Sequence, residues 1–233
     1  MDALDFVDLV RHGMVRFRLP DGPVVYVDPF QLEKAHHDAD LIVVTHSHSD
    51  HFSPEDLRRA AGPDTCFAVT APVADWLSRE MGVATPYISL LSPAAPELVF
   101  ECGATLTPLP AQNKNHPLGF GFGALLTMGG FTYYVAGDTD VLSDVACDVL
   151  FVPCDGLYNM LNFMEQVPAQ LAAMSRKPGV VVPYHYSGYM EGTDKNGPRL
   201  AEKLEGLGYN VRLLCRPWAQ KPSQANRAGA PPP

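Results

Sequence analysis

Three histidines and one aspartate stand within six residues, as His46, His48, Asp50 and His51. Clustered imidazoles with a carboxylate are typical ligands of zinc, iron or manganese, rather than of calcium or magnesium. On an extended or tightly turning loop, His46 and His48 can point the same way, which leaves Asp50 and His51 to face a neighbouring point. The spacing therefore predicts a transition-metal site. The alternative is a polar loop that is merely rich in histidine, and so specific a pattern argues against it.

The residues on both sides of this stretch predict how it is held. Residues 40–44 form an apolar, β-branched run that indicates a buried strand. Ser53 and Pro54 are types preferred at the N-cap and first position of a helix, so we expect a helix over residues 54–61. The histidines then lie on a loop after the carboxyl end of a strand, which is where open α/β folds place their chemistry.

A second strand end carries another candidate ligand, Asp138. Residues 125–135 alternate around Gly129-Gly130, which predicts a hairpin with a tight two-residue turn. The hairpin delivers Asp138 at the end of its second strand. Asp140, two residues later, is interpreted as the N-cap of a following helix rather than as a ligand.

Two more histidines are candidates on weaker grounds. Residues 180–184 predict an apolar strand, and His185 follows it directly. His116 lies on a polar loop, where a surface position and a ligand position are equally good interpretations of the residue alone.

These motifs together resemble the metallo-β-lactamase superfamily. The motifs that match are His46-x-His48-x-Asp50-His51, Gly137-Asp138-Thr139 and Pro183-Tyr184-His185-Tyr186. Within the superfamily the chain is similar to the small single-domain metal-dependent hydrolases grouped with L-ascorbate-6-phosphate lactonase and the phospholipase D that acts on N-acyl-phosphatidylethanolamine. The resemblance covers residues 5–215 and implies an α/β fold, the αββα sandwich, with one or two metals at one edge of its sheets. The loop at Cys154-Asp155 and Asn159 departs from the pattern of those relatives, so a relative's substrate is not transferred.

The resemblance implies a ligand set for two metals. It assigns to the first metal His46, His48, His116 and Asp138, and to the second Asp50, His51, Asp138 and His185. Asp138 would be shared, since the two oxygens of one carboxylate can each bind a cation. Two Zn²⁺ ions are expected, with Mn²⁺ or iron as alternatives.

Six other residues are predicted to support the ligands or line the pocket. Asp28, at a strand end, is expected to orient a metal-bound histidine, because such rings need an acceptor for their other nitrogen. The remaining five are His12, Lys114, Tyr158, Tyr184 and Tyr186. For His12 a structural role, and for the last two tyrosines core packing, are the alternatives.

The expected activity is hydrolysis of an ester-type bond in a small molecule, which could be anionic. A metal-bound hydroxide would be the nucleophile, with Asp50 holding it or moving a proton to the leaving group. Phosphodiester, lactone and carboxylic ester are all open, and the resemblance favours a phosphodiester, another phosphoester or a lactone. The alternatives are an iron-dependent oxidoreductase of the same fold, which His48 disfavours because flavodiiron relatives carry glutamate there, and a metal-binding domain without turnover.

Composition sets the remaining expectations. The chain has 233 residues, of which 46% are hydrophobic, enough for one large core, and its formal charge of −9 disfavours nucleic acid as a partner. Five scattered cysteines, an acidic N-terminus without signal-peptide features and no apolar run of membrane-spanning length favour the cytoplasm. We expect one hydrolase domain over residues 1–216 and a disordered tail over 217–233, and a homo-oligomer is left open.

Overall fold

Two six-stranded sheets form the centre of the computed structural model, which describes residues 2–215. The first sheet has its strands in the order β1 (Val7–Arg11), β2 (Met14–Arg18), β3 (Val24–Val27), β4 (Ala39–Val44), β5 (Ala61–Val69) and β6 (Ile88–Leu90). The second sheet has the order β12 (Val180–Tyr184), β11 (Val149–Pro153), β10 (Phe131–Val135), β9 (Gly121–Met128), β8 (Thr105–Ala111) and β7 (Leu98–Val99).

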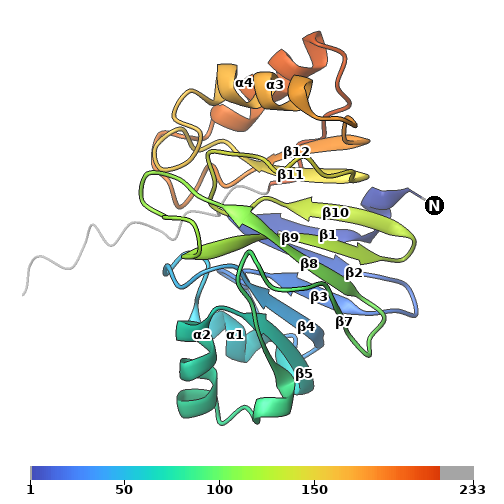
Figure 1. The fold of residues 1–233 in the computed structure, drawn as a ribbon, viewed down its shortest axis with the longest axis vertical. Helices are drawn as coiled ribbons and strands as arrows, with labels where there is room; N and C mark the ends of the chain where they lie inside the picture. The colour runs from blue at the N-terminus through green and yellow to red at the C-terminus, as the bar shows by residue number, and fades with distance from the viewer. Residues whose placement is uncertain (1, 216–233) are drawn as a thin grey trace, which may run out of the picture.

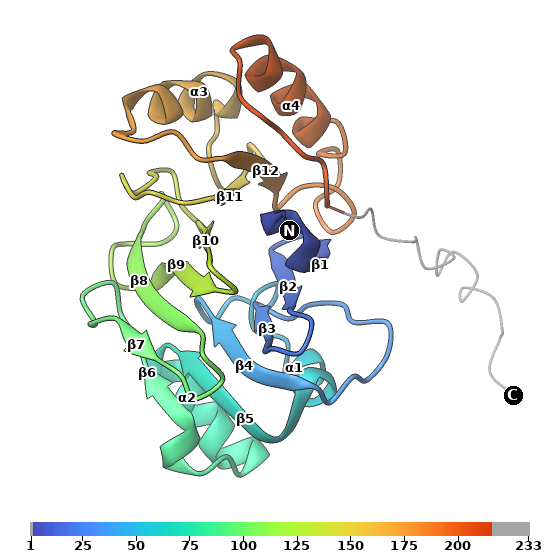
Figure 2. The same cartoon turned by 90° about the vertical axis from the view of Figure 1, so that its right-hand side faces the viewer.

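Helices cover the outer face of each sheet. α1 (Pro54–Ala60) and α2 (Ala71–Trp76) pack on the first sheet, and α3 (Phe163–Ala173) and α4 (Asn196–Gly206) pack on the second. Figure 1 shows these helix pairs at opposite ends of the molecule with the strands between them, and Figure 2 shows the same layers after a quarter turn. The shorter helical turns are Ala3–Phe6, Leu77–Met81 and Thr85–Tyr87. The predicted αββα sandwich is confirmed.

Strand alternation explains why the sandwich forms. In β4, Leu41 and Val43 pack in the core between the two sheets, whereas Ile42 and Val44 pack against the helices of the first sheet. Successive side chains of a strand point to opposite faces, so a continuous apolar run is what a strand covered on both faces requires. β11 obeys the same rule, with Phe151 between the sheets and its neighbours under the helices.

Parallel strands bring the candidate ligands to one edge of the sandwich. β3, β4 and β5 run parallel in the first sheet, as do β10, β11 and β12 in the second. The residues that follow the carboxyl ends of these strands are therefore Asp28, Thr45, Asp138, Asp155 and His185, as the strand bounds show. The N–H of Phe122 donates to the carbonyl of Thr45 at 3.2 Å, which ties the two sheets together at this edge.

Three predictions from the sequence are wrong in detail: a helix over residues 167–176 with Pro168 at its start, a helix cap at Asp140 and a strand over residues 211–214. α3 begins at Phe163, so Pro168 lies inside the helix, where it lacks the N–H that would bond to Met164. Asp140 caps no helix, because the chain passes from β10 to β11 without one, and its carboxylate accepts from the N–H of Met160 instead. Val211 makes only an isolated bridge with Val181, so residues 211–214 form no regular strand.

The start of α1 is confirmed: the Ser53 side chain accepts from the N–H of Asp56, and Pro54 is the first helical residue. Within residues 2–215, no helix is long and apolar enough to cross a membrane. The tail expected over residues 217–233 lies outside the described residues.

We predict that the core between the sheets dominates stability. Leu126 of β9 is fully buried there, whereas Leu90 at the edge of the first sheet is 62% exposed. Leu126→Ala should lower the free energy of unfolding by about 2–5 kcal/mol, because it removes buried surface and leaves a cavity. Leu90→Ala should change it by no more than about 0.5 kcal/mol. Equal midpoints of urea unfolding for both variants would contradict this account of the core.

Candidate metal centre

Eight side chains form two adjacent groups of ligand atoms at the sheet edge. The first group is His46, His48, His116 and Asp138, and the second group is His12, Asp50, His51 and His185. Within each group the nitrogen or oxygen atoms all lie within 4.8 Å of one another. The structure thus brings together all seven residues that the sequence predicts as ligands, and adds His12 to them.

Asp138 lies between the two groups, and its two oxygens face different sides. Oδ2 is 3.9 Å from Nε2 of His46 and 3.7 Å from Nδ1 of His116. Oδ1 is 3.1 Å from Nε2 of His51 and equally far from Nε2 of His185. A carboxylate in this position can hold one cation with each oxygen.

Two buried aspartates fix the rings of the second group. Asp28 accepts from Nδ1 of His51 at 2.7 Å, and Asp155 accepts from Nδ1 of His185 at 3.1 Å. Each neutral ring then keeps a lone pair on Nε2, and these two nitrogens lie only 3.0 Å apart. Two lone pairs that point at each other and at the Asp138 carboxylate repel, so the arrangement fits a cation placed among them.

His46 shows the same fit in the first group. The hydroxyl of Thr45 donates to Asp28 at 2.7 Å and lies 3.1 Å from Nδ1 of His46, from which it can accept. Nε2 of His46 is buried and has no hydrogen-bond partner among the described residues, and neither has Oδ1 of Asp138. Buried polar atoms are nearly always paired, so an unpaired nitrogen on the Oδ2 side of Asp138 and an unpaired oxygen on its other side suit ligands of two adjacent metals.

The pKa shifts of the histidines differ between the two groups. Burial lowers the pKa of His46 and of His116, which keeps both imidazoles neutral, as metal ligation requires. His51 and His185 differ: burial acts to lower their pKa, but the charge of Asp138 and the aspartate that each ring contacts more than offset it and raise the pKa. Without a cation these two rings therefore favour the protonated form, and metal binding would displace the proton from each Nε2. Burial would raise the pKa of Asp138, yet His185 and His51 lower it, so this carboxylate is ionised.

His12 supports the second group through Asp50. Its Nε2 lies 3.0 Å from Oδ2 of Asp50, and its carbonyl accepts from the N–H of His185 at 2.9 Å. His12, Asp28 and His185 all have positive φ values, of 51°, 48° and 55°. Non-glycine residues seldom adopt this left-handed conformation, and strained residues concentrate at functional sites. Three of them around one cluster indicate that the fold holds this geometry against a backbone cost.

Two glycines allow the groups to approach each other. A Cβ atom on Gly13 would stand 2.8 Å from Cε1 of His51 and 3.2 Å from Cδ2 of His185. A Cβ atom on Gly121 would stand 2.9 Å from Cβ of His46. Any larger residue at these positions would therefore push a ligand ring out of place.

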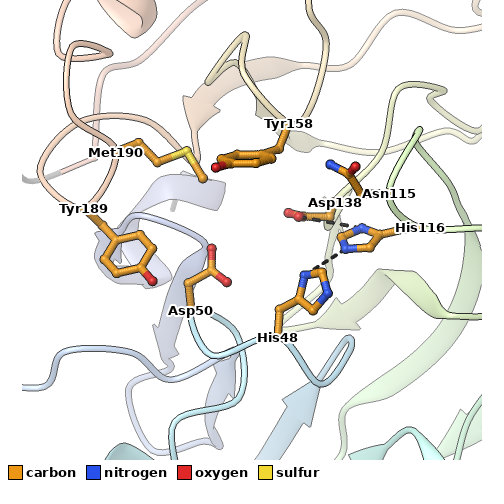
Figure 3. Close-up of a pocket in the computed structure, with 8 residues that line it drawn as sticks. All are labelled: His48, Asp50, Asn115, His116, Asp138, Tyr158, Tyr189 and Met190. Carbon is orange, nitrogen blue, oxygen red and sulfur yellow. Dashed lines mark hydrogen bonds and ion pairs between the residues drawn. The ribbon is translucent and has the colours of Figure 1, made fainter.

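A cavity of about 300 Å³ opens beside both groups. Its lining residues are His48, Asp50, Asn115, His116, Asp138, Tyr158, Tyr189 and Met190, all drawn in Figure 3. Tyr158, one of the pocket residues predicted from the sequence, is among them. Asn115, Tyr189 and Met190 were not predicted, because a polar or aromatic residue on a loop carries no periodic signal of its position.

Three predicted pocket residues do not line the cavity. Tyr184 is fully buried between the sheets, and its hydroxyl accepts from the N–H of Gly137 at 2.8 Å. Tyr186 packs in the core under α3 and α4. Lys114 donates from Nζ to the carbonyl of Leu157 at 3.2 Å, which holds its ammonium group on that loop. Tyr184 ends β12 and packs between the sheets, and Tyr186, beyond the strand, packs on the helix side, so both occupy core positions, the alternative given for them.

Comparison with known proteins decides the family. A family model described as "Beta-lactamase superfamily domain" matches residues 19–186, which is most of the chain. The chain belongs to this superfamily. The resemblance to metallo-β-lactamases that the sequence motifs indicate is thereby confirmed.

Individual proteins resemble the chain in sequence or in fold. A protein of Nitratidesulfovibrio vulgaris named "UPF0173 metal-dependent hydrolase" is 29% identical over 224 residues, which cover 87% of this chain and 89% of that protein. The crystal structure of a putative metal-dependent hydrolase from Parabacteroides distasonis has a TM-score of 0.70 at 24% identity, and the match covers 89% of this chain and 91% of the other. CmlA, a diiron β-hydroxylase from Streptomyces venezuelae, shares the fold at 16% identity, with a TM-score of 0.63 over 88% of this chain and 52% of its own.

We predict that Asp28 and Asp155 control metal affinity without being ligands. Asp28→Asn and Asp155→Asn replace an acceptor with an amide that can turn its N–H toward the histidine ring. Each should weaken metal binding by about 10- to 100-fold, measured by competition with a fluorescent zinc chelator. The matched control is Asp148→Asn, because Asp148 accepts from the N–H of Thr132 at 2.8 Å, away from both groups. Affinities equal to the control's would show that the two aspartates do not orient the rings.

Proposed function

We propose that this chain, a metal-dependent hydrolase of the metallo-β-lactamase superfamily, holds two metal ions and cleaves an ester-type bond. The first ion would be held by His46, His48, His116 and Asp138, and the second by Asp50, His51, Asp138 and His185. The observation that carries the proposal is the position of Asp138, whose Oδ1 and Oδ2 face different groups of imidazoles. A single-metal site would leave one of these oxygens buried without a counter-charge.

Zinc is the metal that we favour. Imidazole nitrogens outnumber carboxylates in the proposed ligand set, and such sets suit zinc, with iron or manganese as alternatives. Both groups border the cavity, as His48 and His116 do from the first and Asp50 from the second, so each site keeps room for a reactant. When bound, the metals would supply Lewis acidity and a hydroxide nucleophile near neutral pH.

Asp50 is placed to move a proton. It lines the cavity, its side chain is 14% exposed, and His12 holds one of its oxygens. Burial would raise the pKa of Asp50, but the hydrogen bond from His12 and the charges of His51 and His185 more than offset this and lower it. The carboxylate is therefore ionised at neutral pH, so it can bind a metal and accept a hydrogen bond from a bound water, and its place in the cavity lets it pass a proton to the leaving group.

The serine and cysteine side chains of the chain are poorly placed to act as the nucleophile in place of a metal-bound hydroxide. No serine or cysteine lines the cavity within residues 2–215. Cys154 directly precedes Asp155, which contacts the ligand ring of His185. The side chain of Cys154 is fully buried, however, and burial raises the pKa of its thiol well above the ordinary value. Direct hydrolysis, without a covalent intermediate on the protein, is the mechanism that we propose. All five cysteines are unpaired, which supports a cytoplasmic location.

The scissile bond is an ester in the broad sense. A phosphodiester, another phosphoester and a lactone all present an oxygen that paired metals can polarise and a leaving oxygen that Asp50 can protonate. An iron-dependent oxidoreductase is the other candidate class, and the diiron protein of similar fold keeps it open.

We predict that Asp50→Asn abolishes most turnover and leaves the fold intact. The substitution keeps the side-chain volume but removes the charge, so the rate of ester hydrolysis should fall about 100-fold or more. Asp64→Asn is the control, because Asp64 is exposed on β5. Circular dichroism should be the same for both variants. A variant at Asp50 that keeps the parent rate would exclude the carboxylate from proton transfer.

We also predict that the purified protein contains about two transition-metal ions per chain, chiefly zinc. Plasma mass spectrometry measures the content, and a visible spectrum without absorption bands separates zinc from iron. Asp138→Ala should lose metal, whereas Asp140→Ala should keep it, because Asp140 binds the N–H of Met160 instead. Removal of metal by a chelator should stop hydrolysis, and added zinc should restore it. Iron with oxygen-dependent turnover would favour the oxidoreductase.

A further inference from the structure

An aromatic wall faces the metal centre across the cavity. Tyr158 and Tyr189 line the cavity, and 51% and 48% of their surfaces are exposed, while Met190 beside them is 7% exposed. Figure 3 shows Tyr189 and Met190 on the opposite side of the cavity from His48 and His116, with Tyr158 at the top of the view. Flat apolar rings left open beside polar ligand groups are typical of a site that binds an apolar part of its substrate.

Tyr189 is held in place before any substrate arrives. Its ring centre lies 5.1 Å from that of His12 and 5.2 Å from that of Phe30, which it meets edge-on. Its loop is closed by two hydrogen bonds of 2.7 Å, from the N–H of Ser187 to Oγ1 of Thr193 and from Oγ of Ser187 to Asp194. A ring that is already ordered costs less conformational entropy when it binds a ligand.

Tyr158 is held by the same carboxylate that orients a ligand of the metal centre. Oδ1 of Asp155 accepts from the N–H groups of Leu157, Tyr158 and Asn159, at 2.8, 2.6 and 3.1 Å. Oδ2 of Asp155 accepts from the side chain of Asn159 at 3.0 Å and from His185 at 3.1 Å. Tyr158 and the His185 ring therefore have a common support, which fixes the wall relative to the proposed reaction centre.

The cavity has no positively charged side chain that could pair with an anionic group of a substrate outside the scissile bond. Within the described part of the chain, none of its lining residues is lysine or arginine, and Asp50 and Asp138 add negative charge. Lys114, which precedes Asn115 of the lining, is bonded to the carbonyl of Leu157 instead. Sites that recognise phosphate monoesters or carboxylates normally pair the anion with arginine or lysine. An anionic group outside the scissile bond would therefore face carboxylates and aromatic rings without a counter-charge.

We infer that the substrate is an uncharged ester or lactone with a flat apolar ring next to the scissile bond. The ring packs against Tyr158 and Tyr189, over Met190, while the ester group lies at the ligand groups around Asp138. The inference rests on the proposed hydrolase function and narrows its substrate class. Among the ester types left open above, it selects the lactone or carboxylic ester over the phosphate monoester.

Three γ-butyrolactones test the inference because they share one scissile bond. They carry a phenyl, a methyl or a 4-carboxyphenyl substituent at the γ carbon. With the metal-loaded protein, kcat/KM for the phenyl lactone should exceed that for the methyl lactone by about tenfold, and the carboxylate should remove the gain. Tyr158→Leu and Tyr189→Leu should each reduce the phenyl preference by about three- to tenfold. Tyr87→Leu, on an exposed turn between α2 and β6, is the matched control.

Binding separates this inference from the proposed function. Hydroxamates ligate metals without being hydrolysed. Calorimetry with benzohydroxamate, acetohydroxamate and 4-carboxybenzohydroxamate therefore measures how the aromatic wall changes binding affinity, independently of turnover. The same order of preference, with the same loss in the two tyrosine variants, supports the inference even if no lactone is hydrolysed, in which case only the proposed function fails. Equal affinity and equal turnover for phenyl and methyl compounds, a preference for the carboxylate, or a phenyl preference unchanged in both variants would overturn it.

Discussion

The ionised carboxylate of Asp138 is buried between imidazoles of both ligand groups, and its charge must be balanced where water scarcely reaches. It is only 7% exposed, and both of its oxygens have histidine nitrogens within 4 Å. Transfer of such a charge from water costs several kcal/mol unless a counter-charge is present. Two cations would supply that charge. Much of the surrounding structure serves to hold Asp138 and its imidazoles in this arrangement, since the hydroxyl of Tyr184 binds Gly137 and Asp155 fixes His185.

The same constraint explains where the backbone is strained. His12, Asp28 and His185 adopt left-handed conformations at the points where the chain leaves a strand and turns toward the metal centre. The glycines at positions 13 and 121 lie where a methyl group would meet a histidine. These features cost free energy locally, and the burial of apolar side chains in the three cores compensates for that cost. Three of the left-handed non-glycine residues thus lie at the edge where ligand atoms must converge, although others, such as Asp21 and His37, lie in loops elsewhere.

Sequence reasoning predicts the strands, and with them the strand-end ligands, because apolar runs and turn glycines are local signals. It predicts the partner of only one histidine: Asp28 was recognised at a strand end, whereas Asp155, which follows β11 in the same way, was noted only as a departure from relatives. An aspartate two residues after a buried strand was the signal that could have identified it. The position of Tyr189 could not be predicted, since its contacts with His12 and Phe30 join segments that are distant in the chain. For Tyr184 the sequence left both a pocket position and a core position open. The alternation of side chains along β12 decides between them only when the face that each residue presents is known.

The central claim is that two metal ions lie on either side of Asp138. Anomalous diffraction from crystals saturated with zinc, recorded on both sides of the zinc absorption edge, tests it most directly. We predict two peaks, one among His46, His48 and His116 and one among Asp50, His51 and His185, with one oxygen of Asp138 directed at each. A single peak in fully saturated crystals, or a pair of peaks that Asp138 does not bridge, would contradict the account.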